Sequence, residues 1–160
     1  MKYLLLNRHA NSLSAGFKIS DHERELSDIG FEECKLMGEK IRKKEISFDL
    51  MLSSSASRAF MTCRLIASEV NYPMDKIQVS RDIYGANKDL LKSIIKQTSD
   101  NIGALAVYGH NPAFHLLAEE LYNKNINQFP TCSMIYVLFK VDCWINCFEG
   151  DRETIFLISP

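Results

Sequence analysis

The stretch Tyr3-Leu4-Leu5-Leu6-Asn7-Arg8-His9 is an apolar run that ends in a cation and an imidazole. A short, nearly continuous apolar run is typical of a strand buried in a parallel sheet. In open α/β sheets, ligands bind beyond the carboxyl ends of the strands. Arg8 and His9 are therefore predicted to lie where such a sheet would bind a phosphate group.

Two further segments repeat this pattern. Residues 48–53 form an apolar run that leads to Arg58, and residues 104–108 form another that leads to His110. A single arginine is usually a surface charge, and a single histidine is usually a hydrogen-bonded structural residue. Three parallel strands, however, would bring these side chains to the same sheet edge as Arg8 and His9, and this convergence favours a common site.

Predicted strands and helices alternate along the chain, which favours a parallel sheet with helices on both faces. We expect one domain, residues 1–160, with a three-layer α/β/α fold and a mostly parallel central sheet. Strands are predicted at residues 2–7, 48–53, 77–79 and 104–108, and helices after the N-caps Ser27, Asn87 and Asn111 and at residues 57–70. Residues 134–139, 144–148 and 154–158 are predicted to be strands of an antiparallel ribbon at the sheet edge.

Length and composition narrow the class of protein. A chain of 160 residues with 46% hydrophobic and 24% charged residues can bury a full core. A net charge of −1 provides no chain-wide attraction for nucleic acid or an acidic membrane. The first apolar run is shorter than the roughly 7–15 residues of a signal peptide core, and no segment approaches the ~20 residues of a membrane span. We expect reduced cysteines and a cytoplasmic protein with neither nucleic-acid nor membrane partners.

The residue types at the predicted site suit phosphoryl transfer. The planar guanidinium group of arginine binds phosphate oxygens in pairs and stays charged. A neutral imidazole can attack phosphorus, form a phosphohistidine and be released by water, which divides one difficult step into two. Arg8, His9, Arg58 and His110 would together supply both functions.

At this point the chain resembles the histidine phosphatase (phosphoglycerate mutase-like) superfamily. The resemblance is carried by Arg8-His9, by Arg58 after a serine-rich strand end, and by Gly109-His110-Asn111-Pro112. Short SixA-type phosphohistidine phosphatases are the most similar branch, on residues 8–12, residues 21–27 with Gly30, residues 52–54 with Arg58-Ala59 and Thr62, and residues 83–86.

The resemblance implies a phosphoglycerate mutase-like fold and a role for each site residue. His9 would be the phosphorylated nucleophile, and Arg8, Arg58 and His110 would form the phosphate pocket. Asn11 would join them in binding the substrate. The resemblance also implies a reaction without a metal ion or cofactor, and the sequence contains no carboxylate cluster suited to magnesium or zinc.

A general acid is harder to assign. Larger members of the superfamily protonate the leaving oxygen with a carboxylic acid near the third strand, where this chain offers Asp82. Asp21 and Glu23, on the loop after the first strand, are the other candidates. An ester depends strongly on such an acid, whereas a phosphoramidate can leave once solvent protonates its ring nitrogen. A weak or missing acid therefore favours phosphohistidine as the substrate.

The expected function is hydrolysis of phosphohistidine on a phosphotransfer or phosphocarrier domain, with inorganic phosphate as a product. Little chain remains for a lid, so we expect an open pocket that admits a protein substrate. One alternative is a phosphatase of small phosphate monoesters, which would require a carboxylic acid near the bound phosphate. Another is a non-catalytic phosphoprotein-binding module, which would not need the nucleophile His9. His22 and His115 are expected to stay outside the catalysis.

Overall fold

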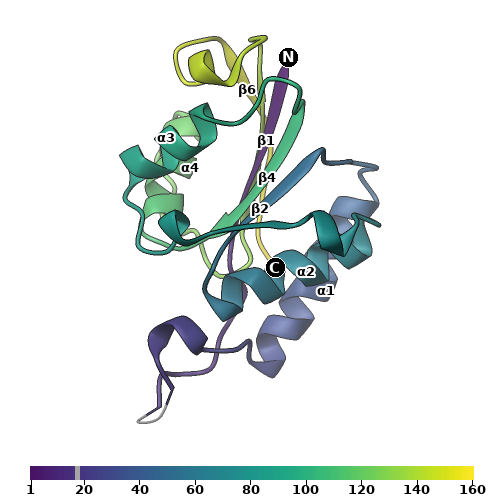
Figure 1. The fold of residues 1–160 in the computed structure, drawn as a ribbon, viewed down its shortest axis with the longest axis vertical. Coiled ribbons are helices and arrows are strands. Elements are labelled where there is room, and N and C mark those ends of the chain that lie inside the picture. The colour runs from purple at the N-terminus through teal and green to yellow at the C-terminus, as the bar shows by residue number, and fades with distance from the viewer. Residues whose placement is uncertain (17–18) are drawn as a thin grey trace.

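The computed structural model describes residues 1–16 and 19–160 and contains a sheet of strand order β3-β2-β4-β1-β5-β6 (Figure 1). Four parallel strands extend from one edge of this sheet to its middle. The strands β1 (Lys2–Arg8), β2 (Leu50–Ser54), β3 (Gln78–Ser80) and β4 (Ala104–Gly109) run in one direction. At the other edge, β5 (Met134–Phe139) pairs antiparallel with both β1 and β6 (Arg152–Ile158).

Helices cover both faces of this sheet. The helices α1 (Asp28–Arg42) and α2 (Ser57–Glu69) lie on one face, and α3 (Lys88–Lys96) and α4 (Ala113–Tyr122) lie on the other (Figure 1). The three-layer α/β/α fold with a mostly parallel sheet is thereby confirmed. Within the described residues, no helix is both long enough and apolar enough to cross a membrane.

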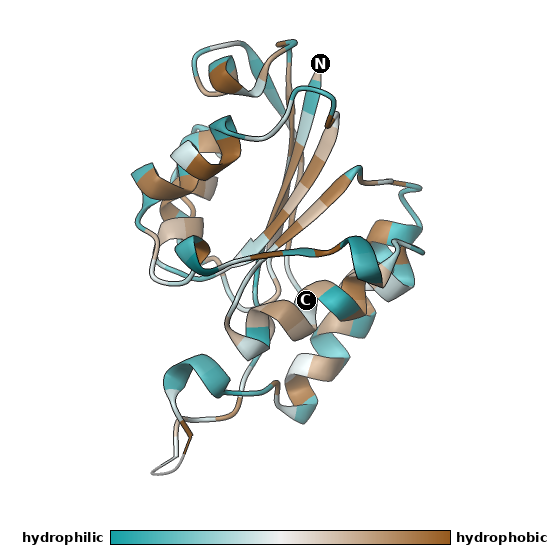
Figure 2. Cartoon of the chain, viewed as in Figure 1, coloured by the Kyte–Doolittle hydropathy of each residue, from teal (hydrophilic) through white to brown (hydrophobic). Residues whose placement is uncertain are grey.

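The apolar run of β1 is continuous because both of its faces are covered. Leu4 and Leu6 belong to the core beside α3 and α4, and Leu5 belongs to the core beside α1 and α2. All three side chains are fully buried. Successive side chains of a strand point to opposite faces, so a strand between two helical layers requires apolar residues at every position. Figure 2 shows the same hydrophobic colouring along the central strands.

Two of the three predicted helix caps are confirmed. The Ser27 hydroxyl accepts a hydrogen bond from the Gly30 amide (3.2 Å), and the Asn87 side chain accepts one from the Leu90 amide (2.8 Å). The prediction for Asn111 is wrong. Its side chain instead donates to the Phe129 carbonyl (3.0 Å), because the loop between α4 and β5 passes close to this helix start.

The strand predicted at residues 144–148 is also wrong. This segment contains the short 3-10 turn η4 (Trp144–Asn146), and β6 begins at Arg152. Trp144 is fully buried, and its indole N–H donates to the Ile102 carbonyl (2.8 Å). Its backbone N–H donates to Asp100 (2.8 Å). The apolar residues of this segment, with Trp144 and Cys147 fully buried, therefore belong to a packed turn rather than to a strand.

The start of α1 lies directly on the backbone of Asn11. The Ser27 N–H donates to the Asn11 carbonyl (3.1 Å), and the Ser27 hydroxyl donates to the Asn11 side chain (2.6 Å). A Cβ atom at Gly30 would lie 2.0 Å from the Asn11 carbonyl oxygen. Glycine at residue 30 thus permits the close approach that fixes the segment after His9.

Gly30→Ala should therefore lower the free energy of unfolding by about 1–3 kcal/mol, as overpacking of a tight contact does. In an unobstructed helix the same change stabilises by up to about 1 kcal/mol, so the sign alone is diagnostic. Urea denaturation measures the difference. Gly16→Ala is the matched control, because its Cβ would meet no atom within 4 Å. Unchanged stability of Gly30→Ala would contradict the close packing described above.

Candidate active site

The carboxyl ends of β1, β2 and β4 bring together four side chains, here called the cluster: Arg8, His9, Arg58 and His110. Arg8 is the last residue of β1 and is paired in register with Gly109, the last residue of β4. The rings of His9 and His110 have centroids 5.1 Å apart. The Arg58 Nε atom lies 3.3 Å from the His9 Nε2 atom. Residues distant in the sequence therefore share one sheet edge.

The His9 ring is oriented by a hydrogen bond to its own loop. Its Nδ1 atom lies 2.7 Å from the Ala10 carbonyl oxygen, which can only accept, so Nδ1 carries the proton. The Nε2 atom is then unprotonated, and its lone pair accepts a hydrogen bond from the Arg58 Nε–H (3.3 Å). Burial lowers the pKa of His9 to about 4; the bond to Ala10 opposes this shift, and the charges of Arg58 and Arg8 add to it. At neutral pH the ring is therefore uncharged and Nε2 is unprotonated, which is the form in which an imidazole can act as a nucleophile.

His110 is held on the opposite side of the cluster. Its Nε2 atom lies 2.8 Å from the Ser54 hydroxyl at the end of β2. Burial lowers the pKa of His110 to about 3, and the neighbouring His9 and Arg58 add to the shift. A bound anion would reverse these effects, because negative charge beside an imidazole favours its protonated form.

Thr62 ties the loop of His9 to the helix of Arg58. Its hydroxyl accepts a hydrogen bond from the Ala10 amide (3.0 Å) and donates to the Arg58 carbonyl (2.7 Å). All of these atoms are buried. The hydrogen bonds of Thr62 therefore hold the His9 loop against α2, which keeps the imidazole of His9 close to the guanidinium of Arg58.

Arg58 is 6% exposed, and each of its guanidinium nitrogens donates a hydrogen bond. Nε donates to His9, Nη1 donates to the Asp21 carbonyl, and Nη2 donates to the Asp21 carboxylate (3.0 Å). Asp21 belongs to the 3-10 turn η1 (Asp21–Glu23) on the loop after β1. Burying a guanidinium without a partner costs free energy, and the Asp21 carboxylate offsets that cost. It binds Nη2 and leaves Nε next to the His9 Nε2 atom.

Asp21 is arranged as an acceptor. Its carboxylate also receives hydrogen bonds from Arg24 (2.8 Å) and the Tyr84 hydroxyl (2.9 Å). These two bonds and the charge of Arg58 hold the pKa of Asp21 well below its usual range. An ionised carboxylate cannot donate a proton to a leaving group, so the resting geometry makes Asp21 a brace for Arg58.

The other acid candidates lie outside this network. The Glu23 carboxylate accepts from the Ser20 hydroxyl (2.8 Å) and is exposed. Asp82 is exposed within the turn η3 (Arg81–Ile83). Within residues 1–16 and 19–160, neither side chain hydrogen-bonds to the cluster. The same described part contains no group of three His, Cys, Asp or Glu side chains arranged to hold a metal ion.

Two residues beside Asp21, Arg24 and Tyr84, were not predicted from the sequence to belong to the site. Arg24 donates to Asp21, to the Ser12 hydroxyl (2.8 Å) and to the Leu13 carbonyl (2.6 Å), and its charge helps to lower the pKa of His9. The Tyr84 ring packs edge-on against both His22 and His110, with centroid distances of 4.8 and 5.6 Å. Both residues belong to segments that carry the family resemblance, which was the only available signal for them.

The remaining candidates have structural partners. The Asn11 side-chain oxygen accepts from the Ser27 hydroxyl, and the Asn11 backbone N–H donates to the Glu33 carboxylate (2.7 Å). His22 bonds to the Ser55 hydroxyl (2.9 Å) at the rim of the cluster. His115 lies in α4, and its Nε2–H donates to the Ile126 carbonyl (2.6 Å).

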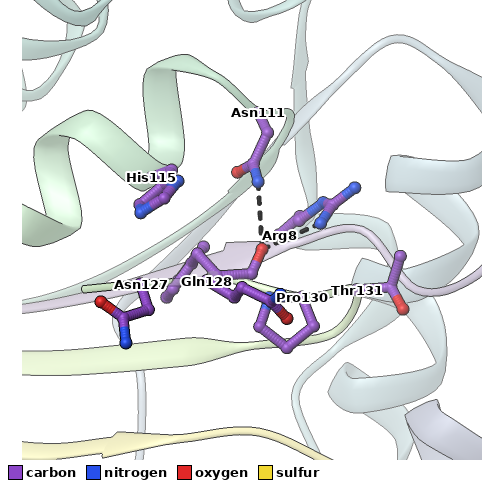
Figure 3. Close-up of a pocket in the computed structure, with 8 residues that line it drawn as sticks. Arg8, Asn111, His115, Asn127, Gln128, Pro130 and Thr131 are labelled. Carbon is purple, nitrogen blue, oxygen red and sulfur yellow. Dashed lines mark hydrogen bonds between the residues drawn. The ribbon is translucent and has the colours of Figure 1, made fainter.

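A cavity of about 340 Å³ begins at Arg8 and is here called the Arg8 cavity. It lies between the start of α4 and the loop that leads to β5, and its lining is formed by Arg8, Asn111, His115 and residues 127–131 (Figure 3). The Phe129 carbonyl accepts from both Arg8 (2.8 Å) and Asn111 (3.0 Å), as the dashed lines in Figure 3 show. Arg8 thus belongs both to the cluster and to this cavity.

Comparisons with known proteins agree with this geometry. A sequence model of the histidine phosphatase superfamily (branch 1) matches residues 4–86. A phosphoglycerate mutase of Schizosaccharomyces pombe is 33% identical over 100 residues, which cover 54% of this chain and 46% of that protein. The chain therefore spans about half the length of that relative.

Two further comparisons cover nearly the whole chain. An uncharacterized protein of Mycobacterium leprae is 30% identical over 165 residues, covering 96% of this chain and 99% of that protein. The structure of a protein histidine phosphatase, SixA, complexed with tungstate superposes with a TM-score of 0.81 at 19% identity. That superposition covers 98% of this chain and 96% of the other and shows a shared fold.

We expect the His9 ring to titrate with a midpoint near pH 4 rather than at the ordinary 6.5. Below pH 6.5 the unfolded chain then binds more protons than the folded one, so this histidine reduces stability as the pH falls toward 4. NMR spectra of histidine-labelled protein, assigned with His9→Ala, measure the midpoint. Inorganic phosphate should move it upward, because an anion favours imidazolium. A midpoint near 6.5 without phosphate would contradict the burial of a neutral ring.

Proposed function

Since the chain belongs to the histidine phosphatase superfamily, we propose that it is a phosphatase that hydrolyses phosphohistidine on a protein. The observation that carries this proposal is the neutral His9 ring, whose Nε2 lone pair faces Arg58 within the cluster. The shared fold with a SixA structure that binds tungstate, a tetrahedral oxoanion, also supports it. The proposed partner is a phosphotransfer or phosphocarrier domain.

In the first step, the His9 Nε2 lone pair attacks the phosphorus atom of the substrate. The bond between phosphorus and the substrate imidazole breaks, and that ring nitrogen takes up a proton from solvent. The guanidinium groups of Arg8 and Arg58, together with His110, contact the phosphoryl oxygens as charge develops on them. The hydrogen bond from Nδ1 to the Ala10 carbonyl keeps Nε2 unprotonated for this attack.

In the second step, water attacks the phosphorus atom of phosphorylated His9. The bond between phosphorus and Nε2 breaks, inorganic phosphate leaves, and Nε2 recovers its lone pair. The reaction consumes one water molecule and returns the enzyme unchanged. Since Nδ1 keeps its proton and its carbonyl partner throughout, the ring needs no tautomer change between the two steps.

The choice of phosphohistidine over an ester rests on Asp21. This carboxylate is ionised and bound to Arg58, and neither Glu23 nor Asp82 is hydrogen-bonded to the cluster in the described structure. Without a positioned acid, an alkoxide leaves poorly, whereas an imidazole needs only a proton that water can supply. The geometry therefore favours cleavage of a phosphorus–nitrogen bond.

A phosphatase or mutase of small phosphate esters is the second candidate, favoured by the similarity to a phosphoglycerate mutase. It would require a proton donor at the leaving oxygen. A binding module without catalysis would have no use for a buried, oriented imidazole whose Nε2 is unprotonated.

We expect His9→Ala to abolish turnover and to prevent formation of a phosphoenzyme. Wild-type protein mixed with a radiolabelled, histidine-phosphorylated carrier domain should acquire phosphate that is labile in acid and stable in base. His22→Ala is the matched control and should still be labelled, since its ring bonds to Ser55 and packs against Tyr84 rather than hydrogen-bonding to the cluster. Circular dichroism checks that both variants fold. Labelling of His9→Ala would remove the nucleophile assignment, and wild-type turnover of monoesters alone would transfer the proposal to the ester candidate.

Arg58→Ala should weaken vanadate binding by about 10–100-fold at fixed ionic strength, the range expected for lost hydrogen bonds to a charged ligand. Arg58→Lys should recover only part of the affinity, because an ammonium group lacks the planar fork that reaches both His9 and Asp21. Arg64→Ala, on the exposed side of the same helix, is the control. Calorimetric titration gives the affinities, and equal binding by all of these proteins would exclude Arg58 from the anion pocket.

A further inference from the structure

The Arg8 cavity has a mixed hydrogen-bonding character. Among the described residues that line it, Arg8 is the only Lys, Arg, Asp or Glu. Three side chains of the lining are carboxamides: Asn111, Asn127 and Gln128 (Figure 3). A carboxamide offers N–H donors and a carbonyl acceptor, as a peptide group does. The lining therefore matches an uncharged ligand that donates and accepts in alternation, attached to an anion at the Arg8 end.

Two buried polar atoms at this cavity lack partners. The Arg8 Nε atom and the Asn111 Oδ1 atom are buried and have no hydrogen bond in the structure. Buried polar atoms are paired in the great majority of cases, so this donor and this acceptor would each gain a partner if a small side-chain movement opened them to a ligand in the cavity.

Two exposed residues of the lining, Asn127 and Gln128, also have side chains without hydrogen bonds within residues 1–16 and 19–160. Both residues belong to the loop between α4 and β5. The next residue of this loop, Phe129, accepts hydrogen bonds from Arg8 and Asn111 through its carbonyl. Two free amide groups are thus held next to a fixed point of the active site.

We infer that the Arg8 cavity binds the extended polypeptide segment that flanks the phosphohistidine of the substrate protein, through hydrogen bonds between its backbone and the carboxamides. This inference rests on the proposed function. Arg8 links the two sites, because the same side chain contributes to the cluster and to the cavity wall. Asn111 links them again, since it directly follows His110 in the chain.

The test compares two substrates with the same scissile bond. One is a ten-residue peptide with a central phosphohistidine, and the other is free phosphohistidine, which lacks the flanking peptide groups. Wild-type protein should show a higher kcat/KM for the peptide. In the double variant N127A/Q128A, the ratio of the two kcat/KM values should fall about tenfold, mainly through a higher KM for the peptide, as the loss of two hydrogen bonds would cause.

The matched control is the double variant Q97A/N101A. These two amides are also exposed, and they line a different cavity of about 420 Å³ beside α3. This control should keep the wild-type ratio. A ratio unchanged in N127A/Q128A, or a wild-type protein without preference for the peptide, would overturn the docking inference and leave the proposed function intact.

The proposed function fails in a different way. A wild-type protein that hydrolyses neither phosphohistidine substrate would overturn both the function and the inference built on it. If N127A/Q128A instead lost turnover of a sugar phosphate while wild-type protein ignored the peptide, the cavity would bind hydroxyl groups, and the inference would again be overturned.

Discussion

The parallel hydrogen bonding of β1 to β4 places Arg8 opposite Gly109, and the ladder continues one residue further, where the His9 amide donates to the Gly109 carbonyl (2.9 Å). On its other side, the His9 carbonyl accepts from the Cys132 amide (3.1 Å). The backbone of His9, the proposed nucleophile, is therefore fixed by hydrogen bonds from two directions. A shift of one residue in this register would turn the side chains of β1 to the opposite faces and separate the two histidines. Gly109 itself permits the close fit, because a Cβ there would lie 2.4 Å from the ring of Phe114.

Charge is concentrated locally in a chain whose net charge is only −1. Three arginines, Arg8, Arg24 and Arg58, act on the pKa of His9, and the carboxylate of Asp21 partly neutralises two of them. The histidines remain uncharged in this field, since burial and neighbouring cations both disfavour imidazolium. The result is a positively charged site around uncharged imidazoles. Under the proposed function, it would attract a phosphoryl group, and His9 could attack without first losing a proton.

The regions proposed for chemistry and for recognition adjoin each other and meet at Arg8. The cluster holds the groups that would act on phosphorus, and the Arg8 cavity holds neutral amides that would act on the chain carrying it. With this division, the reaction would depend on the charges of the cluster, and the choice of substrate would depend on hydrogen bonds in the Arg8 cavity. Asp21 supports the first region only, because its bonds go to Arg58, Arg24 and Tyr84.

Local sequence patterns determined the fold class and the convergence of Arg8, His9, Arg58 and His110, because a strand covered on both faces must be apolar throughout and its last residues must reach the sheet edge. The same patterns predicted a strand at residues 144–148, where the structure has a turn that contains the buried Trp144. They also predicted a helix cap at Asn111, whose side chain instead bonds to the loop before β5. The brace formed by Asp21, the positions of Arg24 and Tyr84, and the Arg8 cavity were decided by tertiary structure alone. A loop has no hydrophobic periodicity from which its path could be predicted. The path of these loops is set by hydrogen bonds to residues far away in the chain, such as the bond between Asp21 and Arg58.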